Sequence, residues 1–126
     1  MNLDELNKLS GIILDSSIEV HRNLGPGLLE SVYEVCLCKE LASRGVRYER
    51  QVALPVVYKG ETLNADFRID VLVDDKIVVE LKAVELLMPV HKAQLLTYLK
   101  LADKKLGLLI NFNVPRLIDG FVRMIN

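Results

Sequence analysis

Three charged residues near the middle of the chain have the types and spacing for phosphate chemistry. Asp70 lies ten residues before Glu80, and Lys82 follows Glu80 with one residue between them. Carboxylate oxygens are the ligands that Mg²⁺ prefers, and a lysine beside them adds a positive charge where a phosphate would bind. The same spacing also arises by chance on an exposed hairpin with ordinary salt bridges. The rest of the chain must decide between these two interpretations.

Two short β-branched runs on either side of Asp74 and Asp75 predict a β-hairpin that carries these residues. If Val73 pairs with Ile77, the alternation of side chains makes one face of the hairpin entirely apolar. That face would carry Ile69, Val71, Val73, Ile77, Val79 and Leu81. The opposite face would place Asp70 directly across from Glu80. Facing like charges destabilise a sheet, and a divalent cation would compensate them.

Helical spacing of apolar residues predicts three helices around this hairpin. The expected helices are 3–23, 26–43 and one that begins at Pro89. On the second helix Glu30 and Tyr33 are three residues apart and would share a face. A polar stripe on the third helix consists of His91, Gln94 and Tyr98. Each of these side chains also fits an ordinary surface position, so the spacing alone assigns no function.

The remaining apolar segments read as strands. They are expected at 48–54, 56–58, 62–65, 106–112 and 117–125. The order of two helices, several strands, a helix and a further strand favours a mixed sheet that is covered by helices. At 126 residues and 14.2 kDa, the chain is expected to form one domain over residues 1–126.

Composition limits the partners and the compartment. A net charge of −1 and a pI near 6.1 oppose a generic nucleic-acid binder, because such binding depends on neutralising phosphates. No apolar run approaches the roughly 18 residues that span a bilayer, and the first residues do not resemble a signal peptide. We therefore expect a cytoplasmic protein without a membrane partner. Cys36 and Cys38 are expected to be reduced packing residues.

Several motifs fall into one family pattern. Residues 27–33, GLLESVY, fit the pattern GxxExxY, and Asp70 with Glu80-Leu81-Lys82 fits the PD-(D/E)xK signature. The later segments VVELKAVE, HKAQLLTYLK and LGLLINFNV extend the match. The chain thus resembles, over nearly its whole length, the small bacterial and archaeal GxxExxY proteins, which are a PD-(D/E)xK-like family. The spacing of Gln94 and Tyr98 also resembles the QxxxY motif of RecB-type nucleases.

The resemblance implies a fold and a set of residue roles. The fold would be α/β of the restriction-endonuclease type, a mixed β-sheet with an α-β-β-β-α-β core flanked by helices and an extra N-terminal helix. Asp70 and Glu80 would be the principal metal ligands, with the Leu81 carbonyl and Glu30 as further ligands. Lys82 would orient the attacking water and stabilise developing charge. The residues implied to contact substrate are Gln94, Tyr98, Tyr33, His91 and His21. Gln94 and Tyr98 could instead hold Lys82 in position. The two histidines could instead make purely structural hydrogen bonds.

The expected function is a Mg²⁺- or Mn²⁺-dependent phosphodiesterase that acts on nucleic acid, with DNA as the expected substrate. The main alternative is a non-catalytic module of the same fold that binds or regulates together with a partner protein. A third is a structural homo-oligomer that buries the acidic face of the hairpin. The presence of Asp70, Glu80 and Lys82 together favours the enzyme. The sequence leaves open whether DNA or RNA is cleaved, and whether Asp66 joins the site.

Overall fold

The computed structural model describes residues 2–64 and 67–126. Its helices are α1 (Leu3–Leu24), α2 (Glu30–Ser43) and α3 (Pro89–Ala102), with a short 3₁₀ helix η1 (Leu117–Gly120). Its strands are β1 (Tyr48–Ala53), β2 (Val56–Tyr58), β3 (Glu61–Leu63), β4 (Arg68–Val73), β5 (Ile77–Lys82), β6 (Leu106–Asn111) and β7 (Phe121–Ile125). Asp66, whose part in the site the sequence leaves open, lies outside the described residues.

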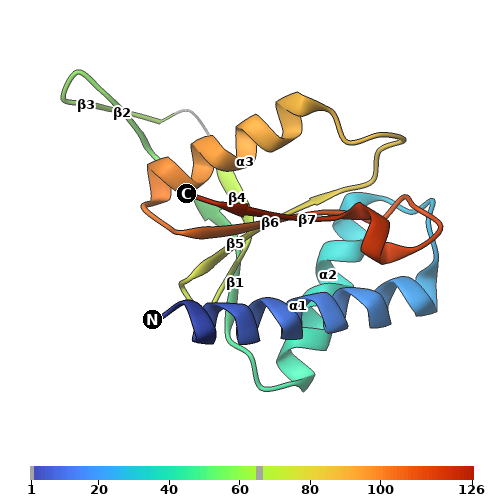
Figure 1. Ribbon diagram of the computed structural model, residues 1–126. Helices are drawn as coiled ribbons and strands as arrows, with labels where there is room; N and C mark the ends of the chain where they lie inside the picture. The colour runs from blue at the N-terminus through green and yellow to red at the C-terminus, as the bar shows by residue number, and fades with distance from the viewer. Residues whose placement is uncertain (1, 65–66) are drawn as a thin grey trace.

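Five of the strands form one mixed sheet in the order β1-β4-β5-β6-β7. Strands β5 and β6 are parallel, and the other neighbours are antiparallel. Helix α3 makes the crossover between the parallel pair, while β2 and β3 form a separate hairpin that projects from the body (Figure 1). This arrangement confirms the predicted fold class, a restriction-endonuclease-like mixed sheet flanked by helices.

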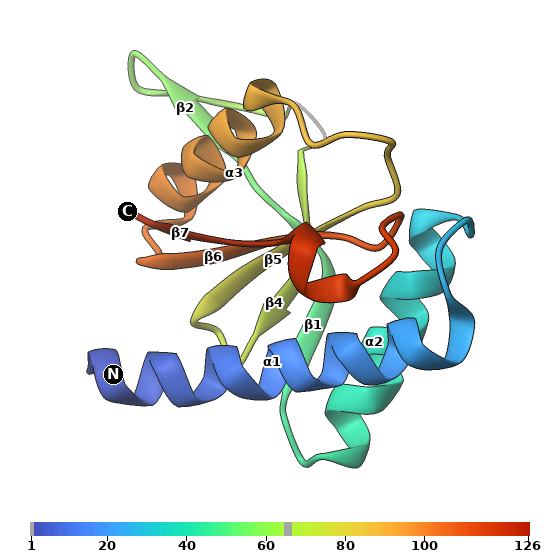
Figure 2. The same ribbon diagram turned by 45° about the vertical axis from the view of Figure 1, so that its right-hand side comes forward.

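Helices cover both faces of the sheet. Helices α1 and α2 lie on one side and α3 lies on the other, as the turned view also shows (Figure 2). The first core lies under α1 and α2 and includes Ile13, Leu37 and Val79. The second core lies under α3 and includes Leu95, Leu99 and Val78. Strand β6 is buried along its whole length because both cores enclose it. No helix in the described part of the chain is long and apolar enough to cross a membrane.

The second helix begins later than the sequence predicted. It starts at Glu30 and not at residue 26, because Gly25 and Gly27 adopt φ values of +69° and +98° that a helix does not accommodate. Its end at Ser43 and the start of the third helix at Pro89 agree with the prediction. The last predicted strand, 117–125, is divided into η1 and β7. Glu30 therefore occupies the first turn of α2.

The predicted register of the hairpin is confirmed, with one correction. Val73 pairs with Ile77, and Val71 pairs with Val79. Ile69, however, packs in the core under α3 and not with Val71 in the core under α1 and α2. Opposite this part of β4, Gln51 of β1 has a φ of +51° and leaves a gap in the ladder. A left-handed residue bends a strand pair, so the simple alternation fails at this end of β4.

Candidate metal and phosphate site

Strands β4 and β5 are paired over only three residues each, and the candidate site lies where they part. The ladder extends from Val73–Ile77 to Val71–Val79 and stops there. Beyond it, the backbone N–H of Leu81 donates a hydrogen bond of 2.9 Å to Oδ2 of Asp70. This side-chain bond links the two strands after the backbone ladder has ended. It also holds the Asp70 carboxylate beside Glu80, as the predicted register requires.

Glu80 is the most deeply buried carboxylate of the site. Its side chain is only 5% exposed, and its Oε1 atom has no hydrogen-bond partner among the described residues. Burial raises the pKa of Glu80 to about 10, with a hydrogen bond and charge repulsion from Asp70 adding to the rise and Lys82 opposing it. A buried oxygen without a donor is unfavourable by about 1–3 kcal/mol. A cation or a proton at this atom would remove that penalty.

The rest of β5 places the backbone of Leu81 and the ammonium of Lys82 beside the carboxylates. Strand β5 pairs with β6 through Leu81–Ile110 and Lys82–Asn111, which fixes its far end. The Lys82 side chain is half-buried, and no acidic oxygen of the described residues lies within 4.0 Å of its ammonium. Its positive charge acts on Glu80 without forming an ion pair. The ammonium therefore remains available for an anionic ligand.

Glu30 approaches the same end of β5 from the start of α2. Its Oε1 accepts a 3.3 Å hydrogen bond from the backbone N–H of Ala83, the residue after Lys82. Asp70, by contrast, affects the pKa of Glu80 through a hydrogen bond and charge repulsion, and it is bonded to the backbone of the next residue, Leu81. Within residues 2–64 and 67–126, no three acidic, histidine or cysteine side chains lie close enough together to hold a metal ion. The structure thus brings together a carboxylate pair, with Glu30 at the margin of the site.

Helix α3 adds a polar pair to the site. The side-chain amide of Gln94 donates a 3.1 Å hydrogen bond to the hydroxyl of Tyr98. Burial raises the pKa of the Tyr98 hydroxyl, and the charges of Glu80 and Asp70 raise it further, so this hydroxyl lies within range of both charges. The helix lies close to the sheet because β6 carries Gly107, where a Cβ would be 2.8 Å from a Leu95 methyl group. Two of the three positions of the predicted stripe, Gln94 and Tyr98, therefore bind each other on the face of α3 that packs against the sheet.

The other three predicted contact residues make hydrogen bonds inside the protein. His21 bonds through Nε2 to the carbonyl of Val114, at 2.7 Å. His91 accepts a bond from the Met88 backbone N–H through Nδ1, at 2.9 Å, and so caps α3.

Tyr33 is fully buried and lies against the loop before α2. Its hydroxyl donates to the Gly25 carbonyl at 2.6 Å and accepts from the Leu28 N–H at 3.1 Å, while its ring stacks on Phe112. These bonds fix the segment that leads into Glu30.

Two residues that shape the site were missed in the sequence. Asn111 is buried, and its side chain both accepts from and donates to the backbone of Val84, which holds the segment after Lys82. Glu34 is buried and binds the side chains of Arg50 and Gln51, which ties α2 to β1. The available signal was a polar residue inside an otherwise apolar run in each case. Such a residue is buried only if its hydrogen bonds are satisfied.

The comparisons with known proteins agree with this geometry. The family model of the PD-(D/E)XK nuclease superfamily matches residues 7–124. Comparisons with curated proteins and with solved structures find no match. The matched range includes both helices that flank the site, the diverging strands and the Asp70, Glu80 and Lys82 signature. The chain therefore belongs to the PD-(D/E)XK nuclease superfamily.

Proposed function

We propose that this protein is a divalent-metal-dependent nuclease that hydrolyses phosphodiester bonds of DNA, and that it is a member of the GxxExxY group. The observation that carries the proposal is the buried, unpartnered Oε1 of Glu80 beside a second carboxylate. A structural salt bridge would provide a donor to this oxygen, whereas a cation site leaves it free. Nucleases of this superfamily generally use divalent metals, and hard oxygen donors suit Mg²⁺ or Mn²⁺.

The proposed ligands come from three elements. Asp70 of β4 and Glu80 of β5 would be the principal ligands, with the backbone carbonyl of Leu81 as a third. Glu30 of α2 would be an accessory ligand, and its bond to the Ala83 N–H holds it near this end of β5. The cation, when bound, would supply electrophilic stabilisation of the negative phosphate. Two facing carboxylates would then no longer repel each other.

The remaining residues would act on water and phosphate. The Lys82 ammonium, which has no acidic partner among the described residues, would orient the attacking water and stabilise negative charge on the phosphate oxygens. The Gln94 and Tyr98 pair would hold the phosphate or fix Lys82. We assign positioning roles to Tyr33, His21 and His91, because the hydrogen bonds of all three are made to the protein backbone.

A non-catalytic binding module with a partner protein is the second candidate. It is favoured by the net charge of −1 and because no three acidic, histidine or cysteine side chains of the described residues gather into a metal-binding group. Such a module would still bind a cation at Asp70 and Glu80, so metal binding alone does not distinguish the two functions. Cleavage of nucleic acid distinguishes them, because only the nuclease would catalyse it.

The test is nicking of supercoiled plasmid DNA with Mg²⁺ or Mn²⁺. We expect the wild-type protein to nick the plasmid, and the variants Glu80→Gln and Lys82→Met to lose this activity. Glu61→Gln, on the projecting hairpin, is the matched control and should retain it. Thermal melting of each variant verifies folding. A wild-type protein that binds Mn²⁺ but cleaves neither duplex, single-stranded DNA nor RNA would support the binding module and contradict the nuclease.

A further inference from the structure

Phe67 is an exposed aromatic residue beside the candidate site. Its side chain is 42% exposed, although large apolar residues of the nearby core are almost completely buried. Its ring centroid lies 6.1 Å from that of Tyr98, with an angle of 55° between the rings. One side of the ring is thus supported by the protein, while part of the ring faces solvent.

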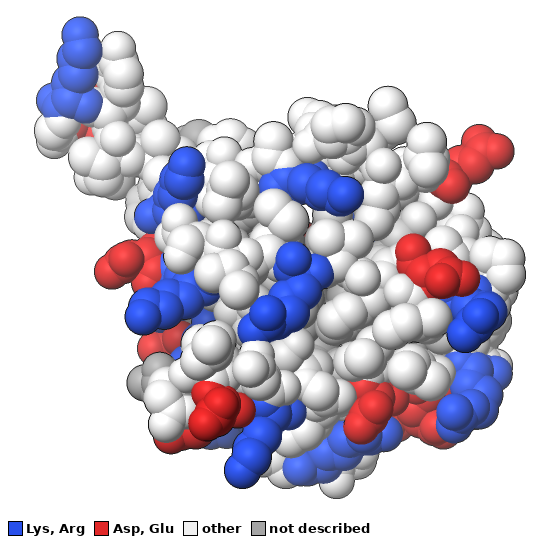
Figure 3. Space-filling model, in the orientation of Figure 1, with Lys and Arg blue, Asp and Glu red and all other residues white. Residues whose placement is uncertain are grey.

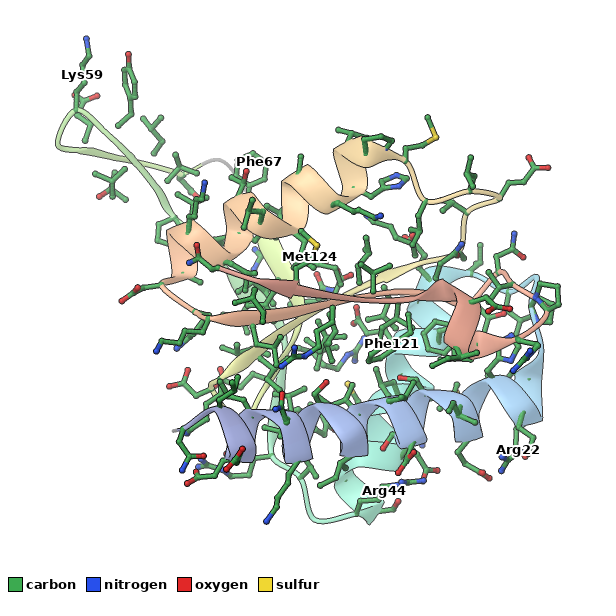
Figure 4. All side chains as sticks on the ribbon, viewed as in Figure 1. Arg22, Arg44, Lys59, Phe67, Phe121 and Met124 are labelled. Carbon is green, nitrogen blue, oxygen red and sulfur yellow. The ribbon has the colours of Figure 1, made fainter. Side chains whose placement is uncertain are left out.

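The contact with Tyr98 links Phe67 to the carboxylate pair. The charges of Glu80 and Asp70 reach the Tyr98 hydroxyl, so Phe67 is one aromatic ring removed from these groups. Along the chain Phe67 precedes Asp70 by three residues, which corresponds to about 10 Å of extended strand. Figure 4 shows Phe67 next to α3, on the opposite side of the sheet from α1. One short nucleic-acid strand is therefore long enough to place a base against Phe67 while its phosphate lies at the carboxylates.

The position of Phe67 is fixed by the backbone. The Phe67 carbonyl accepts a 2.8 Å hydrogen bond from the N–H of Leu54, the buried residue that follows β1. A rigid aromatic side chain provides contact area with little loss of conformational freedom on binding. Phe67 therefore has the support that a stacking surface needs.

A hollow of about 270 Å³ lies beside this ring, between the end of β1 and the β2–β3 hairpin. Its wall includes Phe67, the apolar residues Leu54, Pro55 and Leu63, and the exposed Arg68. Among the described residues, the guanidinium of Arg68 makes one hydrogen bond, a long one of 3.4 Å to the Gln51 carbonyl. An apolar wall with one cation suits a flat, apolar base that is joined to an anionic backbone.

The low charge of the protein strengthens the case for stacking. With a net charge of −1, phosphate neutralisation alone provides little binding free energy. Stacking of a base on an aromatic ring contributes about 1–3 kcal/mol and needs no basic surface. Bases inside a duplex are stacked on their neighbours, so only an unpaired or terminal base has a free face for Phe67.

We propose that Phe67 is a stacking platform for an unpaired nucleobase next to the cleaved phosphate, so that the preferred substrate is a single-stranded or frayed nucleic acid and not an intact duplex. This inference rests on the proposed function for its cleavage site, but binding tests it separately. Phe67 acts on specificity and is not assigned a part in the chemical step.

The experiment measures binding of a fluorescently labelled 12-nucleotide single-stranded DNA in Ca²⁺, with the same sequence as a blunt duplex and as RNA. The wild-type protein is compared with Phe67→Leu and Phe67→Trp. Tyr58→Leu, an exposed aromatic at the hairpin turn, is the matched control. Phe67→Leu should weaken binding of the single strands at least about fivefold and leave the weaker duplex binding unchanged. Phe67→Trp should restore binding, and Tyr58→Leu should have little effect.

Equal binding of the single strand by the wild type and Phe67→Leu would overturn the inference. The inference would also fail if Phe67→Leu lost the same affinity for the duplex as for the single strand, or if Tyr58→Leu lost as much affinity as Phe67→Leu. It would fail as well if the wild type did not bind the single strand. Preference for DNA or for RNA would identify the sugar that is recognised, and either is compatible with stacking. If binding depends on Phe67 but no substrate is cleaved, the inference stands and the nuclease proposal fails. If Phe67→Leu cleaves single strands and duplexes as fast as the wild type does, the nuclease proposal stands and the inference fails.

Discussion

At the scale of single residues, Glu80 carries the strongest physical signal. Its carboxyl is buried next to Asp70, and no described residue donates a hydrogen bond to its Oε1. Burying a charge without a partner is unfavourable, so a carboxylate at this position does not contribute to the stability of the core. A functional site tolerates such a residue because ligand binding compensates it.

This burial predicts that Glu80→Gln stabilises the metal-free protein at alkaline pH. The pKa of Glu80 in the folded state, about 10, lies above its ordinary value of 4.5. Between these pH values the folded state binds more protons than the unfolded state, so the free energy of unfolding falls as pH rises. Gln cannot titrate. In chelator, we therefore expect the variant to be more stable than the wild type at pH 8 by at least about 1 kcal/mol, with the difference vanishing near pH 4.5.

Thermal melting at the two pH values checks this prediction. About 1 kcal/mol corresponds to a shift of roughly 3–6 °C in the Tm of a chain of this size. Added Mn²⁺ should raise the Tm of the wild type and not that of the variant. A variant that is less stable than the wild type at pH 8 in chelator would show that Glu80 has a hydrogen-bonded structural role.

For Lys82 we predict a loss of cleavage without a loss of metal binding. Because its ammonium acts on phosphate and water but not as a metal ligand, Lys82→Met should reduce single-turnover cleavage by about 10²–10⁴-fold at saturating metal. The affinity for Mn²⁺ should be unchanged or slightly higher, since a nearby positive charge has been removed. Lys39→Met, on the exposed surface of α2, is the control. Loss of Mn²⁺ binding in Lys82→Met would contradict this division of roles.

Part of the residue-scale picture could be predicted from the sequence. The facing of Asp70 and Glu80 followed from alternation around the Val73–Ile77 pair, which the structure confirms. The side on which Ile69 packs did not follow, because the bend at Gln51 depends on backbone geometry that no local pattern encodes. Phe67 was missed for a similar reason. Its contact with Tyr98 joins positions 31 residues apart, and only the fold brings them together.

At the scale of elements, the start of α2 determines where Glu30 lies. The segment 25–28 contains two glycines with positive φ and is closed by the Tyr33 hydroxyl, which bonds to both Gly25 and Leu28. The sequence predicted helix from residue 26, since proline is common in the first turn and glycine past an end. The hydrogen bonds that keep this segment out of the helix come from a side chain one turn later. Local propensity could not reveal them.

We predict that Tyr33→Phe loosens this segment without removing the ring from the core. The variant keeps the stacking on Phe112 but leaves the Gly25 carbonyl and the Leu28 N–H without their partner. The free energy of unfolding should fall by about 1–3 kcal/mol. Cleavage should fall as well, because Glu30 is less well held, and higher Mn²⁺ concentration should partly restore it. Denaturant unfolding and a metal titration of cleavage measure both effects.

Tyr48→Phe is the matched control for this variant. Tyr48 is also packed against the same core, and its hydroxyl makes no hydrogen bond among the described residues. Equal stability of Tyr33→Phe and the wild type would mean that the two bonds of Tyr33 do not hold the segment. A loss of cleavage that metal cannot restore would argue against the link to Glu30.

At the scale of the whole molecule, the surface is not that of a strongly basic nucleic-acid binder. Lys and Arg are interspersed with Asp and Glu on the face shown in Figure 3, and the net charge is −1. The fold class was predictable because the order of periodic segments allows few sheets, and a parallel pair needs a crossover helix. The two strands of the projecting hairpin were predicted at 56–58 and 62–65, close to the observed β2 and β3. Their separation from the main sheet was not predicted, since their residues are mostly exposed and follow no burial pattern.

The charge balance predicts a weak dependence of binding on salt. In Ca²⁺, the affinity for a single-stranded 12-mer between 50 and 200 mM salt should follow a log–log slope shallower than about −3, which corresponds to some four phosphate contacts. Fluorescence anisotropy measures this slope. A steeper slope, corresponding to six or more phosphate contacts, would indicate a basic binding surface that the charge distribution does not suggest. Stacking at Phe67 would then be less important for binding.

A crystal of the protein soaked in Mn²⁺, with the metal located by anomalous scattering, shows directly whether Asp70 and Glu80 bind a cation. We predict a peak between Asp70 and Glu80, bound by a carboxylate oxygen of each residue at about 2.0–2.3 Å. A crystal of Glu80→Gln under the same conditions should show no peak at this position. A wild-type crystal without a peak there, or with Mn²⁺ only at other surface carboxylates, would contradict a cation site at Asp70 and Glu80.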